Sequence, residues 1–191
     1  MGVTLRGPEA TRTVAGGTVH LIRIGDISQD GGWENREFVR IEPREKIRDD
    51  LCLRPGDVLF PNRGTRTTAI CFRLDLPKAI AGAQLFVLRP DPAVVDPEYL
   101  AWTLRTEESA NYFKSRRKGS YVQIIQRQDL ADFEIPLPPL WVQKLVAEVA
   151  GLASEERVKS VKLAELTAKL RQAELLDVAR NLQIHVKDGE S

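Results

Sequence analysis

A long run of helix-forming residues follows the Pro-Leu-Pro-Pro segment at 136–139 and limits how the rest of the chain can fold. From Leu140 to about Gln183, glutamate, lysine, alanine and leucine dominate, and Gly151 is the one weak point of the expected helix. Apolar residues within this run repeat at alternating spacings of three and four, as in a short coiled-coil seam: Leu163, Leu166, Leu170 and Ala173. A helix of about forty residues with an apolar stripe needs something to pack against. We therefore expect a dimerisation or docking arm; the alternative is a single helix surrounded by water.

The sequence before these prolines is mostly β-like, with short apolar segments separated by turns. Gly25-Asp26 closes one such segment, and a Pro-Gly turn at Pro55-Gly56 leads into a short buried strand that ends at Phe60. Further strands are expected at residues 19–24, 38–41, 67–74, 83–88 and 133–135.

Two short helices are predicted between the β-rich region and the prolines. Asp96 is a suitable N-cap, Pro97 fits the first helical position, Thr106 can start the second helix, and Gly119 suits its end. The predicted fold class is α+β, a mostly β globule with short helices followed by a long C-terminal α-helix. We assign residues 1–138 to the globule, 139–184 to the long helix and 185–191 to a flexible tail.

Length and composition set the broad class of protein. With 191 residues, 42% of them hydrophobic, the chain has room for one globular domain and an appended element. It has neither an apolar run of membrane-spanning length nor a signal-peptide pattern at its start, so we expect a cytoplasmic protein without a membrane partner. Cys52 and Cys71 are then expected to be reduced thiols rather than a disulfide.

No pattern in the sequence predicts catalysis. Phosphate-binding glycine loops, nucleophile elbows, paired metal-binding histidines and the Asn/Asp-Pro-Pro-Tyr/Phe signature of DNA methyltransferases are all missing. His20 and His185 lie in different regions, and a lone strand histidine such as His20 is far more often structural than catalytic. The acidic pairs at 49–50 and 107–108 are typical of solvated surfaces and of helix starts. We expect neither an enzyme nor a bound metal or cofactor.

The distribution of charge is more informative than its total. The net charge is only +1, which argues against a polybasic coat for nucleic acid. However, five basic residues and no acidic one lie between Asn111 and Gln128, and residues 60–73 hold Arg63, Arg66 and Arg73, again without a carboxylate. Such one-sided positive segments suit an anionic partner.

These basic segments also contain side chains that suit contacts with DNA. Lysine and arginine neutralise phosphates, whereas arginine, asparagine and glutamine form bidentate contacts with base edges. An ordinary polar surface is the alternative interpretation of the same residues. The candidate DNA-binding residues are Asn62, Arg63, Thr65, Arg66, Lys114, Arg116, Arg117, Lys118, Ser120, Tyr121, Gln123, Gln126 and Arg127.

Several motifs, in their order and spacing, resemble one target recognition domain plus one conserved helix of the specificity (S) subunit of type I restriction–modification systems. The resemblance covers about residues 19–152, and one departure is Val142, where the family usually has glutamate. The motifs are Ile24-Gly25-Asp26-Ile27-Ser28, Leu53 to Phe60 with Asn62-Arg63-Gly64, Asp96-Pro97-Glu98-Tyr99-Leu100, Gly119 with Gln123, and Leu130 through Ile135-Pro136-Leu137-Pro138-Pro139 to Gln143 and Leu145-Val146.

The resemblance implies a non-catalytic subunit that reads half of a bipartite site on double-stranded DNA. It also implies that the long helix packs against a second such helix and docks methyltransferase (M) subunits, with restriction (R) subunits as further partners. A full S subunit has two recognition domains and this chain has room for one, so it resembles a half-subunit. We expect residues 140–183 to pair with a second copy, giving a two-fold symmetric reader, or with a different half-subunit.

Two other functions compete with this one. The first is a protein–protein adaptor that uses the C-terminal helix and whose globule binds no DNA. The second, ranked third overall, is a small nuclease with unrecognised metal-binding carboxylates.

Overall fold

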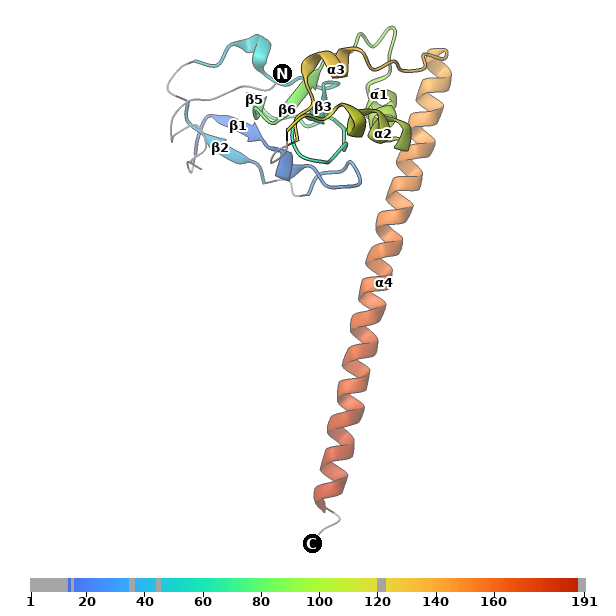
Figure 1. Cartoon of the computed structure of the whole chain (residues 1–191). Coiled ribbons are helices and arrows are strands. Elements are labelled where there is room, and N and C mark those ends of the chain that lie inside the picture. The colour runs from blue at the N-terminus through green and yellow to red at the C-terminus, as the bar shows by residue number, and fades with distance from the viewer. Residues whose placement is uncertain (1–13, 15, 35–36, 44–45, 120–122, 189–191) are drawn as a thin grey trace. The chain divides into compact units, whose positions relative to one another are not determined.

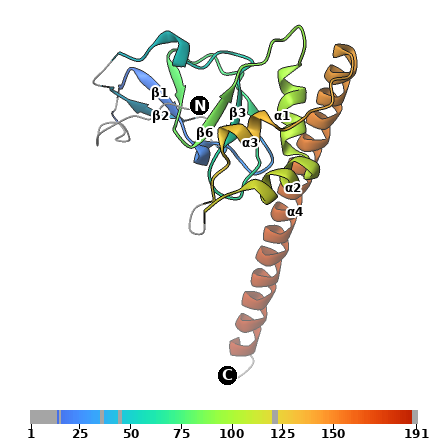
Figure 2. The same ribbon diagram turned by 45° about the horizontal axis from the view of Figure 1, so that its top comes forward.

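The computed structural model describes residues 14, 16–34, 37–43, 46–119 and 123–188, with side chains up to residue 180. The chain divides into two compact units, Met1–Glu148 and Val149–Ser191, and each is described by itself below. The first unit contains two small sheets and short helices, and the second continues the long helix α4 (Figures 1 and 2). The predicted α+β class, with a mostly β globule before a long C-terminal helix, is confirmed.

The first sheet has three strands in the order β2 (Val39–Ile41), β1 (Val19–Ile22) and β5 (Ala79–Ala81). β1 pairs antiparallel with β2 and parallel with β5. All four residues of β1 are buried because it is the central strand of the sheet. The predicted strand at 19–24 is shorter in the structure, since Ile24–Asp26 forms a 3-10 turn (η2) directly after it.

The second sheet is antiparallel, in the order β4 (Ile70–Cys71), β3 (Val58–Pro61) and β6 (Leu85–Leu88). The central strand β3 is buried along its whole length, as the Pro-Gly turn before it predicts. The predicted strand at 67–74 is reduced to the two residues of β4, and a second 3-10 turn, η3, covers Asp49–Leu51.

The two Gly-Asp motifs are matching structural turns. Asp26 accepts a hydrogen bond at Oδ2 from the backbone N–H of Arg23 at 2.7 Å, and Asp57 accepts the equivalent bond from Arg54 at 2.8 Å. The Asp57 carboxylate also receives two hydrogen bonds of 2.7 Å from Arg89. Both carboxylates are buried, so these motifs hold strand ends in place rather than facing a ligand.

The helices α1 (Pro97–Arg105) and α2 (Glu107–Arg116) start at the predicted caps. The Asp96 carboxylate accepts hydrogen bonds from two backbone N–H groups of α1 at 3.0 Å, and the Thr106 hydroxyl accepts one from α2 at 3.3 Å. α1 packs on the second sheet, and Phe113 of α2 lies 5.0 Å from Phe60 of β3 between ring centroids. Gly119 was expected to end the second helix, but α2 already ends at Arg116, and Gly119 lies three residues further on with a φ of +110°.

The predicted strand at 133–135 is wrong. A short helix, α3 (Arg127–Ala131), precedes these residues, which pair with no strand in the described part of the chain. Instead, the Phe133 ring packs 4.8 Å from Tyr112 and 5.2 Å from Phe113. The Phe133 side chain therefore packs against α2 instead of contributing to a sheet.

The last helix, α4, spans Leu140–Asp188 and confirms the long helix predicted after the prolines. Its first turns are fixed to the globule by Gln143, whose side chain is 1% exposed. Gln143 accepts a hydrogen bond at Oε1 from the backbone N–H of Asp96 at 2.9 Å, and its Nε2 donates to the carbonyls of Val94 (3.1 Å) and Pro138 (2.8 Å). None of the helices that the structure describes is both long and apolar enough to cross a membrane.

Candidate nucleic-acid interface

The two basic segments predicted from sequence are joined by backbone hydrogen bonds. The Gly64 N–H donates to the carbonyl of Gln123 at 2.8 Å, and the Ile125 N–H donates to the carbonyl of Asn62 at 2.9 Å. Lys118 exchanges both of its backbone hydrogen bonds with Ile124, at 3.1 and 2.9 Å. Residues 123–125 therefore lie between the loop after β3 and the segment after α2, which are far apart in the sequence.

We call the cations of these segments the basic cluster: Arg63, Arg66, Lys114, Arg116, Arg117, Lys118 and Arg127. Within the described residues, none of them forms an ion pair with a carboxylate. By contrast, Arg73 and Arg89 are paired with Glu98 and Asp57. The basic cluster thus keeps its positive charge available for an anion outside this chain.

Two members of the cluster, Arg66 and Arg117, connect backbone segments. Arg117 donates from Nη2 to the carbonyl of Arg66 at 3.0 Å, and Arg66 donates from Nη2 to the carbonyl of Ile27 at 2.5 Å. The Nε atoms of both side chains are buried and have no hydrogen-bond partner among the described residues. Burial also lowers the pKa of the Arg117 guanidinium, because the charged form loses solvation there.

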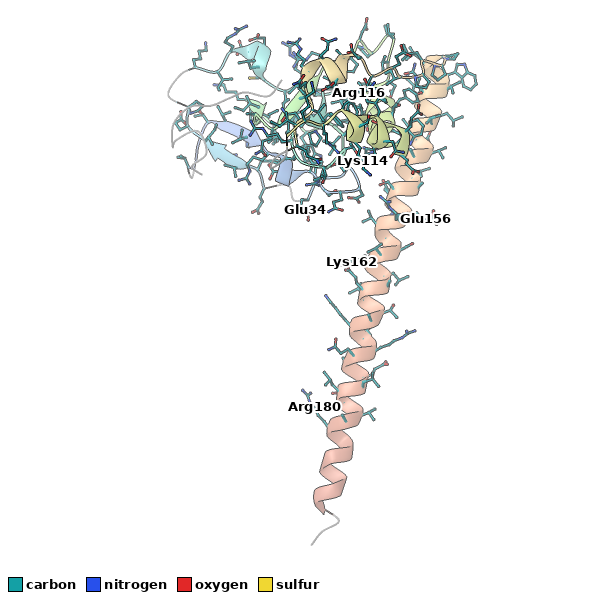
Figure 3. All side chains as sticks on the ribbon, viewed as in Figure 1. Glu34, Lys114, Arg116, Glu156, Lys162 and Arg180 are labelled. Carbon is teal, nitrogen blue, oxygen red and sulfur yellow. The ribbon has the colours of Figure 1, made fainter. Side chains whose placement is uncertain are left out.

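The remaining cations are exposed at the ends of short elements. Lys114 and Arg116 project from the last turn of α2 (Figure 3). The Arg116 guanidinium lies over the Tyr112 ring, 3.7 Å from its centroid, so a cation–π contact restricts its position. The Lys118 ammonium lies 3.5 Å from Oε1 of Gln126, which precedes α3.

The other candidate DNA-binding residues differ in their exposure to solvent. Arg63, Thr65, Gln123, Gln126 and Arg127 are exposed. Asn62 is buried instead, and its Nδ2 donates to the carbonyl of Ala83 at 2.9 Å, so its side chain fixes the start of the loop. Ser120 and Tyr121 lie outside the described residues.

Sequence reasoning overlooked the contact of Tyr112 with Arg116 in this region and, elsewhere in the globule, the buried side chain of Gln143. Tyr112 and Arg116 are four residues apart on a helix, a spacing that brings side chains together and that could have indicated the contact. Gln143 was part of a motif, but no local pattern pointed to its burial or to its three backbone partners.

The described histidine and the two cysteines of the globule lie outside the basic cluster. His20 is buried in the first sheet, with Nδ1 3.1 Å from the carbonyl of Pro77 and Nε2 accepting from Arg40 at 3.2 Å. Cys52 and Cys71 are both free thiols, and burial raises the pKa of Cys71 to about 12. No group of three or more potential metal ligands occurs among the residues that could be searched.

The predicted seam residues of α4 are exposed. Leu163, Leu166 and Leu170 expose 66%, 47% and 65% of their surface, and Ala173 is exposed as well. The structure therefore places an apolar row on the helix without covering it.

Comparison with curated proteins identifies relatives over part of the chain, whereas no family model matches it. A putative type I restriction enzyme MjaX specificity subunit of Methanocaldococcus jannaschii is 38% identical over 69 residues, which are 36% of this chain and 16% of that protein. The type I restriction enzyme MjaVIII specificity subunit of the same organism is 27% identical over 113 residues, or 59% of this chain and 24% of that protein. The chain thus spans less than a quarter of the length of these relatives.

Solved structures share the fold. A chain from a study of complex assembly and conformational transition in a type I restriction–modification system gives a TM-score of 0.61 at 23% identity, covering 78% of this chain and 39% of that one. The HsdS subunit of Thermoanaerobacter tengcongensis gives 0.56 at 23% identity, covering 75% of this chain and 37% of that one. Similarity of sequence and of fold together confirms the resemblance drawn from the motifs, for the part of the chain that aligns.

Proposed function

We propose that this chain, which resembles part of a type I restriction–modification specificity subunit in sequence and fold, is a sequence-specific DNA-binding module. It reads one half of a bipartite site on double-stranded DNA and performs no chemistry itself. The observation that carries the proposal is the basic cluster, whose two segments are hydrogen-bonded together and whose cations have no carboxylate partner among the described residues.

Within the basic cluster, exposed and half-buried residues have different roles. Lys114, Arg116 and Lys118 contact phosphates, because they are exposed cations that pair with no carboxylate among the described residues. Arg63 and Gln123 contact base edges from the paired loops, since their side chains are exposed and suit bidentate hydrogen bonds.

Arg66, Arg117 and Asn62 act as positioning residues rather than as DNA contacts. Their hydrogen bonds go to backbone carbonyls within the globule, so they hold the loop that presents Arg63. This division refines the expectation that all three touch DNA.

The long helix is the partner-binding part of the molecule. It pairs with a second copy of this chain, and the pair docks a methyltransferase subunit and, in a complete system, a restriction subunit. The exposed apolar row on α4 supports the pairing, because an uncovered stripe of leucines is costly in water. A light-scattering mass of one chain at micromolar concentration would exclude self-pairing and leave pairing with a different half-subunit.

DNA binding is tested by fluorescence anisotropy with random-sequence duplex at two salt concentrations. The proposal expects binding that weakens steeply with salt, with a slope set by the number of phosphate contacts. A protein–protein adaptor could use the same exposed row of α4. If the chain is such an adaptor, it should not bind the duplex at either salt concentration. Metal-dependent cleavage of plasmid would instead favour the nuclease.

A further inference from the structure

We infer that α4 pairs with α4 of a second copy in an antiparallel register in which Glu156 faces Lys159 of the second copy. This inference rests on the self-pairing proposed above and adds its direction, its register and the residues that determine both. It follows from two charged residues that interrupt the exposed seam.

The seam extends beyond the four residues recognised from sequence. Val149 and Leu152 continue the same alternation of three and four, and they expose 57% and 61% of their surface. Leu152, Glu156, Lys159 and Leu163 border one shallow groove on the helix, so the charged and apolar residues share a face.

Glu156 and Lys159 therefore occupy two consecutive seam positions, between Leu152 and Leu163. The Lys159 ammonium contacts only the exposed Glu155 of its own helix, at 3.3 Å, and Glu156 has no cationic partner among the described residues. Glu156, like Lys162 and Arg180, projects from the helix (Figure 3). A charged residue within a helix seam costs stability unless it meets its complement, and it thereby specifies orientation and register.

In a parallel pair of helices, neither Glu156 nor Lys159 would face an opposite charge. Seam positions of a parallel, in-register pair meet their own equivalents, so Glu156 would face Glu156 and Lys159 would face Lys159. Like charges at closely packed positions repel, which disfavours this arrangement.

An antiparallel pair offers one register that satisfies both charges and the apolar residues together. When Glu156 faces Lys159 of the second copy, Leu152 faces Leu163, Val149 faces Leu166 and Leu145 faces Leu170. By symmetry each contact occurs twice. A shift of one heptad in either direction would bring Glu156 against Leu166 or Leu152, leaving every seam charge against an apolar residue.

The residues that flank the seam agree with the same register. Glu155 lies beside Lys162 of the second copy, and Glu148 lies beside Lys169. Opposite charges at flanking positions determine partner and orientation in paired helices. These positions are independent of the seam itself, so their agreement is a second argument for the register.

The test is the mass of the full chain at micromolar concentration, by light scattering after gel filtration, for wild type and charge-reversal variants. Wild type is expected to be a dimer. Glu156→Lys and Lys159→Glu each place four like charges at the centre of the pair and should weaken self-association about tenfold or more. The double variant, and an equimolar mixture of the two single variants, should restore it.

Matched controls are Arg157→Glu and Glu165→Lys, which reverse charge on exposed positions outside the seam. Both should remain dimers. A monomeric wild type overturns the self-pairing, and with it the register. Dimeric single variants overturn the register alone, as does a double variant that fails to recover. DNA binding by the monomeric variants, measured by anisotropy on a half-site, reports on the DNA-binding proposal independently.

Discussion

Arg117 donates a hydrogen bond from Nη2 to the backbone carbonyl of Arg66 at 3.0 Å, across 51 residues of sequence. Through this bond a side chain just after α2 holds the loop after β3. Arg66 in turn reaches the carbonyl of Ile27. Two cations that sequence reasoning treated as DNA contacts thus connect three segments of the globule.

Removing the Arg117 contact should reduce sequence preference more than overall affinity. Arg117→Lys keeps the positive charge but lacks the planar fork that reaches Arg66, so the Arg63 loop loses its support. We expect nearly unchanged affinity for random DNA, with preference for the selected site falling about tenfold, the equivalent of one base contact. The measurement is anisotropy on both duplexes, and equal losses on the two would contradict a positioning role.

Removing a phosphate contact should act on all sequences alike. Arg116→Ala deletes an exposed guanidinium held over Tyr112, and we expect weaker binding to cognate and random DNA with a salt slope smaller by roughly one unit. Arg48→Ala is the matched control, because Arg48 is an exposed arginine already paired with Asp50. If the salt slope of the Arg116→Ala variant is unchanged, Arg116 does not contact a phosphate.

Base contacts should have local effects. Arg63→Ala and Gln123→Ala are each expected to cost about 1–3 kcal/mol of discrimination at particular positions of the site. Site selection from a random duplex library, repeated with each variant, locates those positions. A variant that selects the wild-type site with undiminished preference would show that the substituted residue does not contact a base.

Gln143 should matter for stability rather than for DNA binding. Gln143→Leu leaves the backbone N–H of Asp96 and the carbonyls of Val94 and Pro138 without this partner, at about 1–3 kcal/mol for an unpaired buried group. Urea unfolding of the full chain measures the loss. Lys144→Ala, at an exposed neighbouring position, should leave the free energy of unfolding unchanged, and equal stability of the two variants would exclude this role.

The parts of the fold that the sequence predicted correctly are those that depend on a few neighbouring residues. The caps at Asp96 and Thr106, the turn before β3 and the start of α4 each depend on a few neighbouring residues. The strand expected at 133–135 did not form, and Phe133 packs instead against the aromatic rings of Tyr112 and Phe113. A short alternating pattern cannot distinguish these outcomes.

The candidate interface was predictable only in part, because its assembly is nonlocal. Composition identified both basic segments, but nothing in the sequence indicated that Gly64 would pair with Gln123. Nor did it separate exposed Arg63 from half-buried Arg66 three residues later, whose guanidinium turns to a carbonyl of a distant segment. Such assignments require the tertiary contacts themselves.

If the basic cluster reads DNA sequence, the full chain should select a defined site when it is incubated with a random duplex library and the bound duplexes are sequenced. We expect enrichment of one defined half-site, arranged as an inverted repeat by the paired chains, and loss of its preferred positions in the Arg63→Ala and Gln123→Ala variants. Recovery of unenriched random sequence, by wild type and variants alike, would contradict it.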